Sequence, residues 1–236
     1  MVSKKYLVIV PARSGSKEIK DKNIIEICGQ PLIYYTIKHA LRLLKEKKVL
    51  KAIVSTDSTK IAKICSSFGM EVPFLRPKKL ATDESKSIEF VMHAIKYYED
   101  RNIYFDAVVI LQPTSPLRSY DDIINALELF NNVESDSLIS LYYDKDLSDL
   151  KLYKKNDIFA EPINKDHNKG IRRQEYQKIY VRNGAIFITK VEYLKRSHKI
   201  ISERPLFFEM PKERSINIDT YEDLEVAKKY LSILNN

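Results

Sequence analysis

A loop rich in small and basic residues follows the first apolar run of the chain. After residues 6–10 the sequence reads P-A-R-S-G-S-K, and K-D-K-N follows at residues 20–23. Small residues let the backbone approach a ligand, their N–H groups can hold phosphate oxygens, and Arg13, Lys17 and Lys22 supply positive charge. The pattern predicts a binding site for a compact polyanion such as a triphosphate, with a merely solvated basic loop as the alternative.

The two common nucleotide-binding fingerprints are absent. Neither G-x-G-x-x-G nor G-x-x-x-x-G-K-[ST] occurs, and the chain has only five glycines, which disfavours a dinucleotide fold or a P-loop. The formal net charge is +8, and residues 1–51 alone hold twelve Lys or Arg against four acids. Because the surplus gathers near one loop and at the end of one predicted helix, we expect no nucleic-acid partner.

Apolar periodicity predicts the elements that carry the loops. Stripes of apolar residues at helical spacing predict helices over 31–45, 86–98 and 121–131, and another from about 220. Runs of β-branched and aliphatic residues predict strands over 6–11, 50–55, 71–75, 105–112, 137–143, 184–189 and 206–210. This alternation predicts a doubly wound, mostly parallel α/β sheet in a single domain, residues 1–236. Ligands bind such sheets beyond the carboxyl ends of the strands, where the basic loop lies.

The alternation stops between residues 144 and 182. That stretch is polar, with short apolar pieces that no crossover helix covers. We expect an arm or insertion built on a β-hairpin, and an isolated hairpin is marginal in water. Two-fold self-association would bury it, so the sequence predicts a homodimer formed by this arm. The alternative is a lid folded over its own domain.

A series of polar motifs follows the predicted strands along the chain. The segments are P-A-R-S-G-S-K-x-x-x-x-K-N from residue 11, V-S-T-D-S from 54, F-L-R-P from 74, L-A-T-D from 80, L-Q-P-T-S-P-L-R from 111, R-R-Q from 172, N-G-A-I from 183 and N-I-D-T from 217. From about residue 5 to 232 they resemble, in order, the motifs of the acylneuraminate cytidylyltransferases, also called CMP-sialic acid synthetases. The resemblance implies a GT-A-like, Rossmann-type nucleotidyltransferase fold and a homodimer. It implies transfer of CMP from CTP to the anomeric hydroxyl of a sialic-acid-like nonulosonic acid, with release of pyrophosphate.

The resemblance also implies roles for individual residues. Such a transfer depends on positioning and charge neutralisation, and the expected catalytic residues are Arg13, Lys22 and Asp219. The implied substrate contacts are Arg13, Lys17 and Lys22 with the triphosphate, Asn23, Arg76 and Ser87 with the cytidine, and Gln112, Ser115 and Arg173 with the sugar acid.

Cleavage of a triphosphate calls for Mg²⁺ or Mn²⁺, and Mg²⁺ binds through one or two carboxylates together with phosphates and water. Asp219 is the expected ligand, with a helix-capping role as the alternative. The family usually has two acids two residues apart, whereas this chain has Asn217, whose amide oxygen would coordinate only weakly. Glu18 in place of a glycine, and E-S-K-S in place of T-A-S-S at 84–87, are further departures. They bear on metal geometry and substrate preference.

Several motif residues could instead serve the fold or the surface. Arg76, which precedes a proline, could form a surface salt bridge, and Ser115 could cap its Pro-Thr-Ser-Pro turn. Arg118 could pair bidentately with a carboxylate or begin the next helix as a solvated residue. The four histidines share no spacing and are expected to be structural or solvated.

Three rival functions remain open. One is a 3-deoxy-manno-octulosonate cytidylyltransferase, although that family's first loop reads toward L-P-G-K-P. The second is a catalytically weak nucleotide-binding homologue, which Asn217 keeps open. The third, a basic nucleic-acid-binding domain, would need aromatic residues among the basic ones. Two cysteines and no apolar run of about 18 residues lead us to expect a cytoplasmic protein without a membrane partner.

Overall fold

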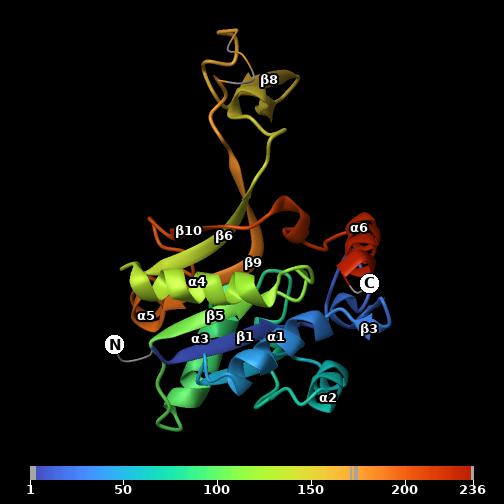
Figure 1. Cartoon of the computed structure of the whole chain (residues 1–236), viewed down its shortest axis with the longest axis vertical. Coiled ribbons are helices and arrows are strands. Elements are labelled where there is room, and N and C mark those ends of the chain that lie inside the picture. The colour runs from blue at the N-terminus through green and yellow to red at the C-terminus, as the bar shows by residue number, and fades with distance from the viewer. Residues whose placement is uncertain (1–3, 171, 173–174, 235–236) are drawn as a thin grey trace.

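The computed structural model describes residues 4–170, 172 and 175–234. A six-stranded sheet forms its centre (Figure 1). Only β9 among its strands runs antiparallel to its neighbours, so the predicted mostly parallel sheet is confirmed. The strands lie in the order β10 (Leu206–Glu209), β6 (Ser137–Tyr143), β9 (Tyr180–Lys190), β5 (Ala107–Leu111), β1 (Tyr6–Pro11) and β4 (Lys51–Ser55).

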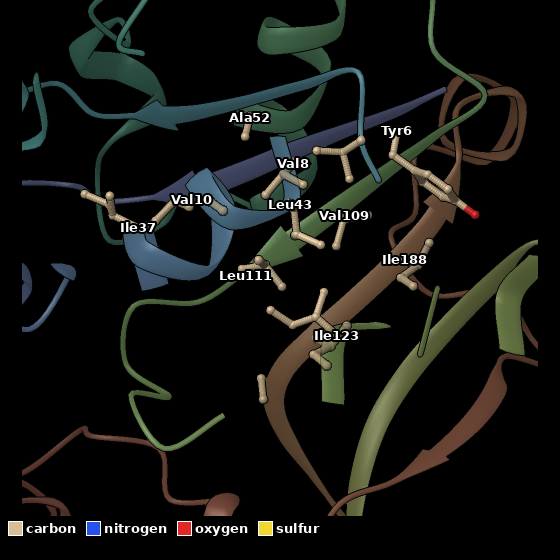
Figure 2. Close-up of a cluster of buried hydrophobic side chains, with 14 of the residues drawn as sticks. Tyr6, Val8, Val10, Ile37, Leu43, Ala52, Val109, Leu111, Ile123 and Ile188 are labelled. Carbon is tan, nitrogen blue, oxygen red and sulfur yellow. The ribbon is translucent and has the colours of Figure 1, made fainter. Parts of the chain in front are cut away.

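Helices cover both faces of this sheet. Those of the described residues are α1 (Tyr34–Lys45), α2 (Thr59–Ser67), α3 (Ser87–Glu99), α4 (Tyr120–Asn132), α5 (Val191–Ser197) and α6 (Tyr221–Leu234). Val8 and Val10 of β1 join a core with α1, α2 and α4 (Figure 2), whereas Leu7 and Ile9 join a second core with α3 and α5. Each fully buried aliphatic side chain contributes about 1.5–3 kcal/mol, so packing on both faces fixes the sheet.

A third apolar cluster joins the two ends of the chain. Ile19 and Leu32, from the segment after β1, pack with Leu224 of α6. This contact brings the basic loop beside the residues that precede α6. The segment itself contains a short 3₁₀ helix (Lys22–Ile24) and the antiparallel pair β2 (Glu26–Ile27) and β3 (Gln30–Pro31).

The strand expected at 71–75 is wrong. Residues Glu71 and Leu75 form only isolated bridges, to Ile53 and Thr56. Pro73 lies between them and has no N–H to donate to a ladder. Helices α2 and α5 lie outside the predicted ranges, and both are short. No helix in the described ranges is long and apolar enough to cross a membrane.

Between β6 and β9 the described residues 144–170, 172 and 175–179 leave the sheet and extend away from it as an arm (Figure 1). Near its end, β7 (Tyr153–Asn156) pairs antiparallel with β8 (Phe159–Pro162). This hairpin is poorly covered, since Ile158 is 82% and Phe159 70% exposed. Its apolar side chains therefore gain little from packing within the described chain.

Candidate functional site

A cavity of about 510 Å³ opens at the carboxyl ends of β1 and β5. Its size suits a small-molecule ligand, and its place is the one expected for a parallel sheet. Of the predicted site residues, those that line the cavity are Arg13, Lys22, Asn23, Arg76, Ser87, Gln112, Asn217 and Asp219. Two others do not, since Lys17 lies outside the lining and Ser115 is buried. The predicted site residue Arg173 falls outside the described residues.

The basic loop after β1 is fixed by polar contacts at both ends. The N–H and Oγ of Ser14 donate to Asp57 at 2.8 and 2.6 Å. Burial alone would raise the pKa of Asp57, but these hydrogen bonds hold it below its ordinary range. At the other end, Nδ2 of Asn23 donates to the carbonyl of Arg13 at 2.9 Å. Asn23 thus fixes the shape of the loop through one side-chain N–H. The amide oxygen and the second N–H of Asn23 are left for contact with a nucleobase.

Acidic side chains balance the cations of this loop. Asp83 pairs with Arg13 at 2.7 Å and with Lys17 at 3.1 Å, and Lys17 and Arg13 together hold the pKa of Asp83 below its usual value. Lys22 donates to Asp219 Oδ1 at 2.9 Å and to the carbonyl of Ile218 at 3.0 Å. A bound polyanion would compete with Asp83 for the same two cations.

Arg76 is buried, so the surface salt bridge considered for it is wrong. Its Nε donates to Ser55 Oγ at 3.0 Å, its Nη2 donates to the Ser55 carbonyl, and the guanidinium lies 4.6 Å from the ring centre of Phe90. Burial lowers the pKa of Arg76 to about 10, which leaves it charged at neutral pH. A fixed, planar cation thereby forms one wall of the cavity.

The turn after β5 differs from expectation at two residues. Ser115 is 1% exposed, and Thr114 lines the cavity in its place, so the expected contact of Ser115 with substrate stays a prediction. Arg118 is also 1% exposed, which excludes both the carboxylate partner and the solvated helix start. Its guanidinium donates to the carbonyls of Gln112 and Ala185 at 3.2 and 2.9 Å and to Thr36 Oγ1 at 2.8 Å.

Asp219 is free to face the cavity because other residues cap α6. Thr220 Oγ1 accepts from the N–H of Asp223, and the Asp223 carboxylate accepts from the N–H groups of Asp219 and Thr220. The alternative that Asp219 caps the helix is therefore wrong. Its Oδ2 accepts from the amide of Asn217.

The oxygen donors of Asp219 and Asn217 would suit Mg²⁺ only if a bound triphosphate supplied further ligands to the ion. Within the described ranges, no three His, Cys, Asp or Glu gather as a metal cluster. One carboxylate, Asp219, and the amide of Asn217 are what the chain offers, and Mg²⁺ readily takes its other ligands from phosphates and water. The residues present fit a cation that arrives with a triphosphate.

A β-bulge in β9 supplies lining residues that the motifs alone did not single out. Opposite Leu141 stands Arg182, but opposite Ile139 stands Phe187, so the register shifts between them. The buried Asn183 holds this bulge: its oxygen accepts from Ser140 Oγ at 2.6 Å, and its Nδ2 donates to Ser215 Oγ at 2.9 Å. Arg182, Asn183 and Phe187 all line the cavity.

Asp57, Asp83 and Asn183 lie within segments that the sequence analysis quoted, but their partners lie far away in the chain, and no local pattern reveals such pairs. The histidines stay outside the cavity. Burial, with a smaller effect from Arg118, lowers the pKa of His39 to about 3, so that imidazole is neutral near pH 7.

The comparisons with known proteins agree on the class. A family model for cytidylyltransferases matches residues 7–235. The chain is 34% identical over 230 residues to an N-acylneuraminate cytidylyltransferase of Escherichia coli O18:K1:H7, covering 94% of this chain and 51% of that protein. It thus spans about half the length of that relative. It is 32% identical to a CMP-N,N'-diacetyllegionaminic acid synthase of Legionella pneumophila, with 97% of each chain covered.

A solved structure of a CMP:2-keto-3-deoxy-manno-octonic acid synthetase complexed with CTP has the same fold. The TM-score is 0.70 at 16% identity, with 98% of this chain and 99% of that chain covered. Identity this low speaks for the fold alone, and the family assignment rests on the model match and the closer sequence relatives. On that basis, the chain belongs to the cytidylyltransferase family.

Proposed function

We propose that this chain transfers CMP from CTP to the anomeric hydroxyl of a nonulosonic acid and releases pyrophosphate. The observation that carries the proposal is a single cavity that brings the cations Arg13, Lys22 and Arg76 together with Asp219. The relative matched over 97% of both chains is named as a CMP-diacetyllegionaminic acid synthase, which supports a nine-carbon sugar acid as acceptor.

In this transfer the hydroxyl oxygen of the sugar forms a bond to the α-phosphorus of CTP. The bond from that phosphorus to the β-phosphate bridging oxygen breaks, pyrophosphate leaves with the bonding electrons, and the hydroxyl proton passes to solvent. Arg13 and Lys22 would neutralise charge on the triphosphate, and Arg76 would hold the nucleoside side of the cavity. Mg²⁺ held at Asp219 and Asn217 would supply further charge neutralisation when bound.

Pyrophosphate release from CTP, measured with a panel of sugar acids, tests the function. We expect turnover with at least one of N-acetylneuraminate, legionaminate or pseudaminate derivatives, and far slower turnover with 3-deoxy-manno-octulosonate. A preference for the eight-carbon acid would select the rival synthetase. Tight CTP binding without pyrophosphate release from any acid would instead identify a nucleotide-binding homologue.

Replacement of Arg13 or Lys22 by alanine should lower kcat/KM for CTP about 30- to 1000-fold, the loss expected for about 2–4 kcal/mol of transition-state stabilisation. Steady-state kinetics with CTP varied provide the measurement. Lys20→Ala is the matched control, because Lys20 lies in the same loop, is exposed and does not line the cavity. Equal kinetics for all three variants and the wild type would reduce the loop to a solvated basic surface.

The carboxylate of Asp219 and the amide of Asn217 lead us to expect metal dependence. We expect no turnover in EDTA, recovery with Mg²⁺ or Mn²⁺, and loss of activity in Asp219→Ala. Asn217→Asp adds a second carboxylate two residues away and should lower the Mg²⁺ concentration that gives half-maximal rate. If that concentration is unchanged in Asn217→Asp, the side chain at 217 does not face the ion.

We further propose that the arm makes a homodimer and brings Arg173 to the partner's cavity. The arm was expected over residues 144–182, but its last three residues belong to β9. The exposed Ile158 and Phe159 at the hairpin support the homodimer, as does the extension of the arm away from its own sheet (Figure 1). That course argues against a lid over the same domain. Two-fold association is the commonest way to bury such a surface.

Light scattering at micromolar concentration should report a dimer, and Phe159→Asp should shift it toward monomer. Mixing Arg173→Ala with Gln112→Ala should restore activity that each lacks alone, because one site of the mixed dimer then carries neither change. A fully active monomer would contradict the proposal. Mixing two preparations of Arg173→Ala is the control and should restore nothing.

A further inference from the structure

A smaller cavity of about 170 Å³ adjoins the main one and shares residues with it. Four residues line both spaces, namely Ser87, Gln112, Arg182 and Phe187. Beyond them the smaller cavity is walled by Ile110, Ile200 and Ile201. The boundary between the two spaces is therefore polar and cationic, whereas the far wall is apolar.

Among the described residues, Arg182 differs from the other cations that line the main cavity in having no polar partner for its guanidinium. Arg13 pairs with Asp83, Lys22 pairs with Asp219, and Arg76 donates to Ser55. For Arg182, the described residues provide no ion pair and no side-chain hydrogen bond; its one partner is the ring of Phe187, 5.9 Å from the guanidinium carbon to the ring centre. An arginine that lines a cavity without an acid beside it is an available anion site.

The β9 bulge explains why this guanidinium lies over the cavity. The register shift places Arg182 and Phe187 close together, and Gly184, at φ +73°, takes a backbone conformation that other residues rarely adopt. Asn183, tied to Ser140 and Ser215, fixes the bulge from the buried side. Bulges beside functional sites commonly serve to aim a side chain.

We propose that Arg182 binds the carboxylate of the acceptor sugar acid and so selects an acidic sugar. This inference rests on the proposed function. In a ulosonic acid the carboxylate is attached to the anomeric carbon, the same carbon that carries the attacking hydroxyl. A guanidinium that grips that carboxylate in a bidentate manner therefore sets the direction of the hydroxyl.

The position of Arg182 favours the sugar acid over the triphosphate. The cations of the first loop, Arg13 and Lys22, already provide the phosphate side of the cavity. Arg182 belongs to the second space as well, where isoleucines 110, 200 and 201 would leave phosphate oxygens without partners. A sugar acid presents one carboxylate together with less polar substituents, which suits a cation beside an apolar wall.

The test compares Arg182→Gln, Arg182→Lys and the wild type in pyrophosphate release, with acid and CTP varied in turn. Arg182→Gln should raise KM for the acid about 10- to 100-fold, the loss expected for a charge-assisted hydrogen bond, while KM for CTP changes less than about twofold. The KM of Arg182→Lys for the acid should lie between those of the wild type and Arg182→Gln, because lysine keeps the positive charge but lacks the two parallel N–H donors of a guanidinium. Arg101→Gln is the control: Arg101 is exposed and stacks on Tyr97 away from both cavities.

A second measurement uses the carboxamide of the same sugar acid. The wild type should have a higher KM for the carboxamide than for the acid. In Arg182→Gln the two KM values should be nearly equal, because without the guanidinium neither substrate can form the charged contact. If Arg182→Gln raises KM for CTP and leaves that for the acid unchanged, the cation serves the triphosphate and the inference is overturned. Unchanged constants for both substrates overturn it as well.

These outcomes separate this inference from the proposed function. If the wild type turns over a nonulosonic acid and Arg182→Gln does so with the same KM, only the role of Arg182 falls. If the wild type neither turns over nor binds any such acid by calorimetry in the presence of CTP, the function falls and the inference falls with it. The melting temperatures of Arg182→Gln, Arg182→Lys and Arg101→Gln should match that of the wild type. Such a match shows that each variant is folded.

Discussion

A single buried guanidinium sets the geometry on which the cavity depends. Arg118 ties together the end of β5 through Gln112, the β9 bulge through Ala185, and α1 through Thr36. A buried charge costs several kcal/mol unless hydrogen bonds compensate it; the two Nη groups of Arg118 have such partners, whereas its buried Nε has none among the described residues. Burial lowers the pKa of Arg118 to about 10 without removing its charge at neutral pH. These three elements must therefore keep their places for the cation to be tolerated. The backbone of Gln112, whose residue lines the cavity, is held by the same contact.

The two ends of the chain complete the site through a similar set of contacts. The third apolar cluster packs the segment after β1 against α6, and this brings Lys22 within 2.9 Å of Asp219. Arg214 holds the approach to α6 through a two-armed contact with the buried Asp122 of α4, at 2.7 and 3.0 Å. The Asn183–Ser215 hydrogen bond joins the same approach to β9. Lys22 and Asp219 come from opposite ends of the sequence. They can act together because separate contacts hold each of their segments in place.

Much of this could be predicted from the sequence, for identifiable reasons. Apolar periodicity indicated the strands of the central sheet and the long helices, but also a strand over 71–75 that does not form. The rule that ligands bind at carboxyl ends pointed to the loops with Arg13 and Gln112. What was missed depends on partners distant in the chain. Arg118 is buried because carbonyl groups at the end of β5 and in β9 accept its hydrogen bonds. The direction of the Arg182 side chain depends on a register shift between β6 and β9. Neither is encoded in a local pattern.

The ion pairs at the cavity explain how so basic a loop can fold while its cations stay available to a ligand. Asp83 pairs with both Arg13 and Lys17, and Asp219 pairs with Lys22. The carboxylates in these pairs are exposed, at 41% for Asp83 and 62% for Asp219, and water screens ion pairs at exposed carboxylates. Exchange of Asp83 for phosphate oxygens would therefore cost little, while the polyanion gains several cations at once. Buried pairs of the same residues would have resisted that exchange, so the exposure of the acids keeps the loop both folded and available.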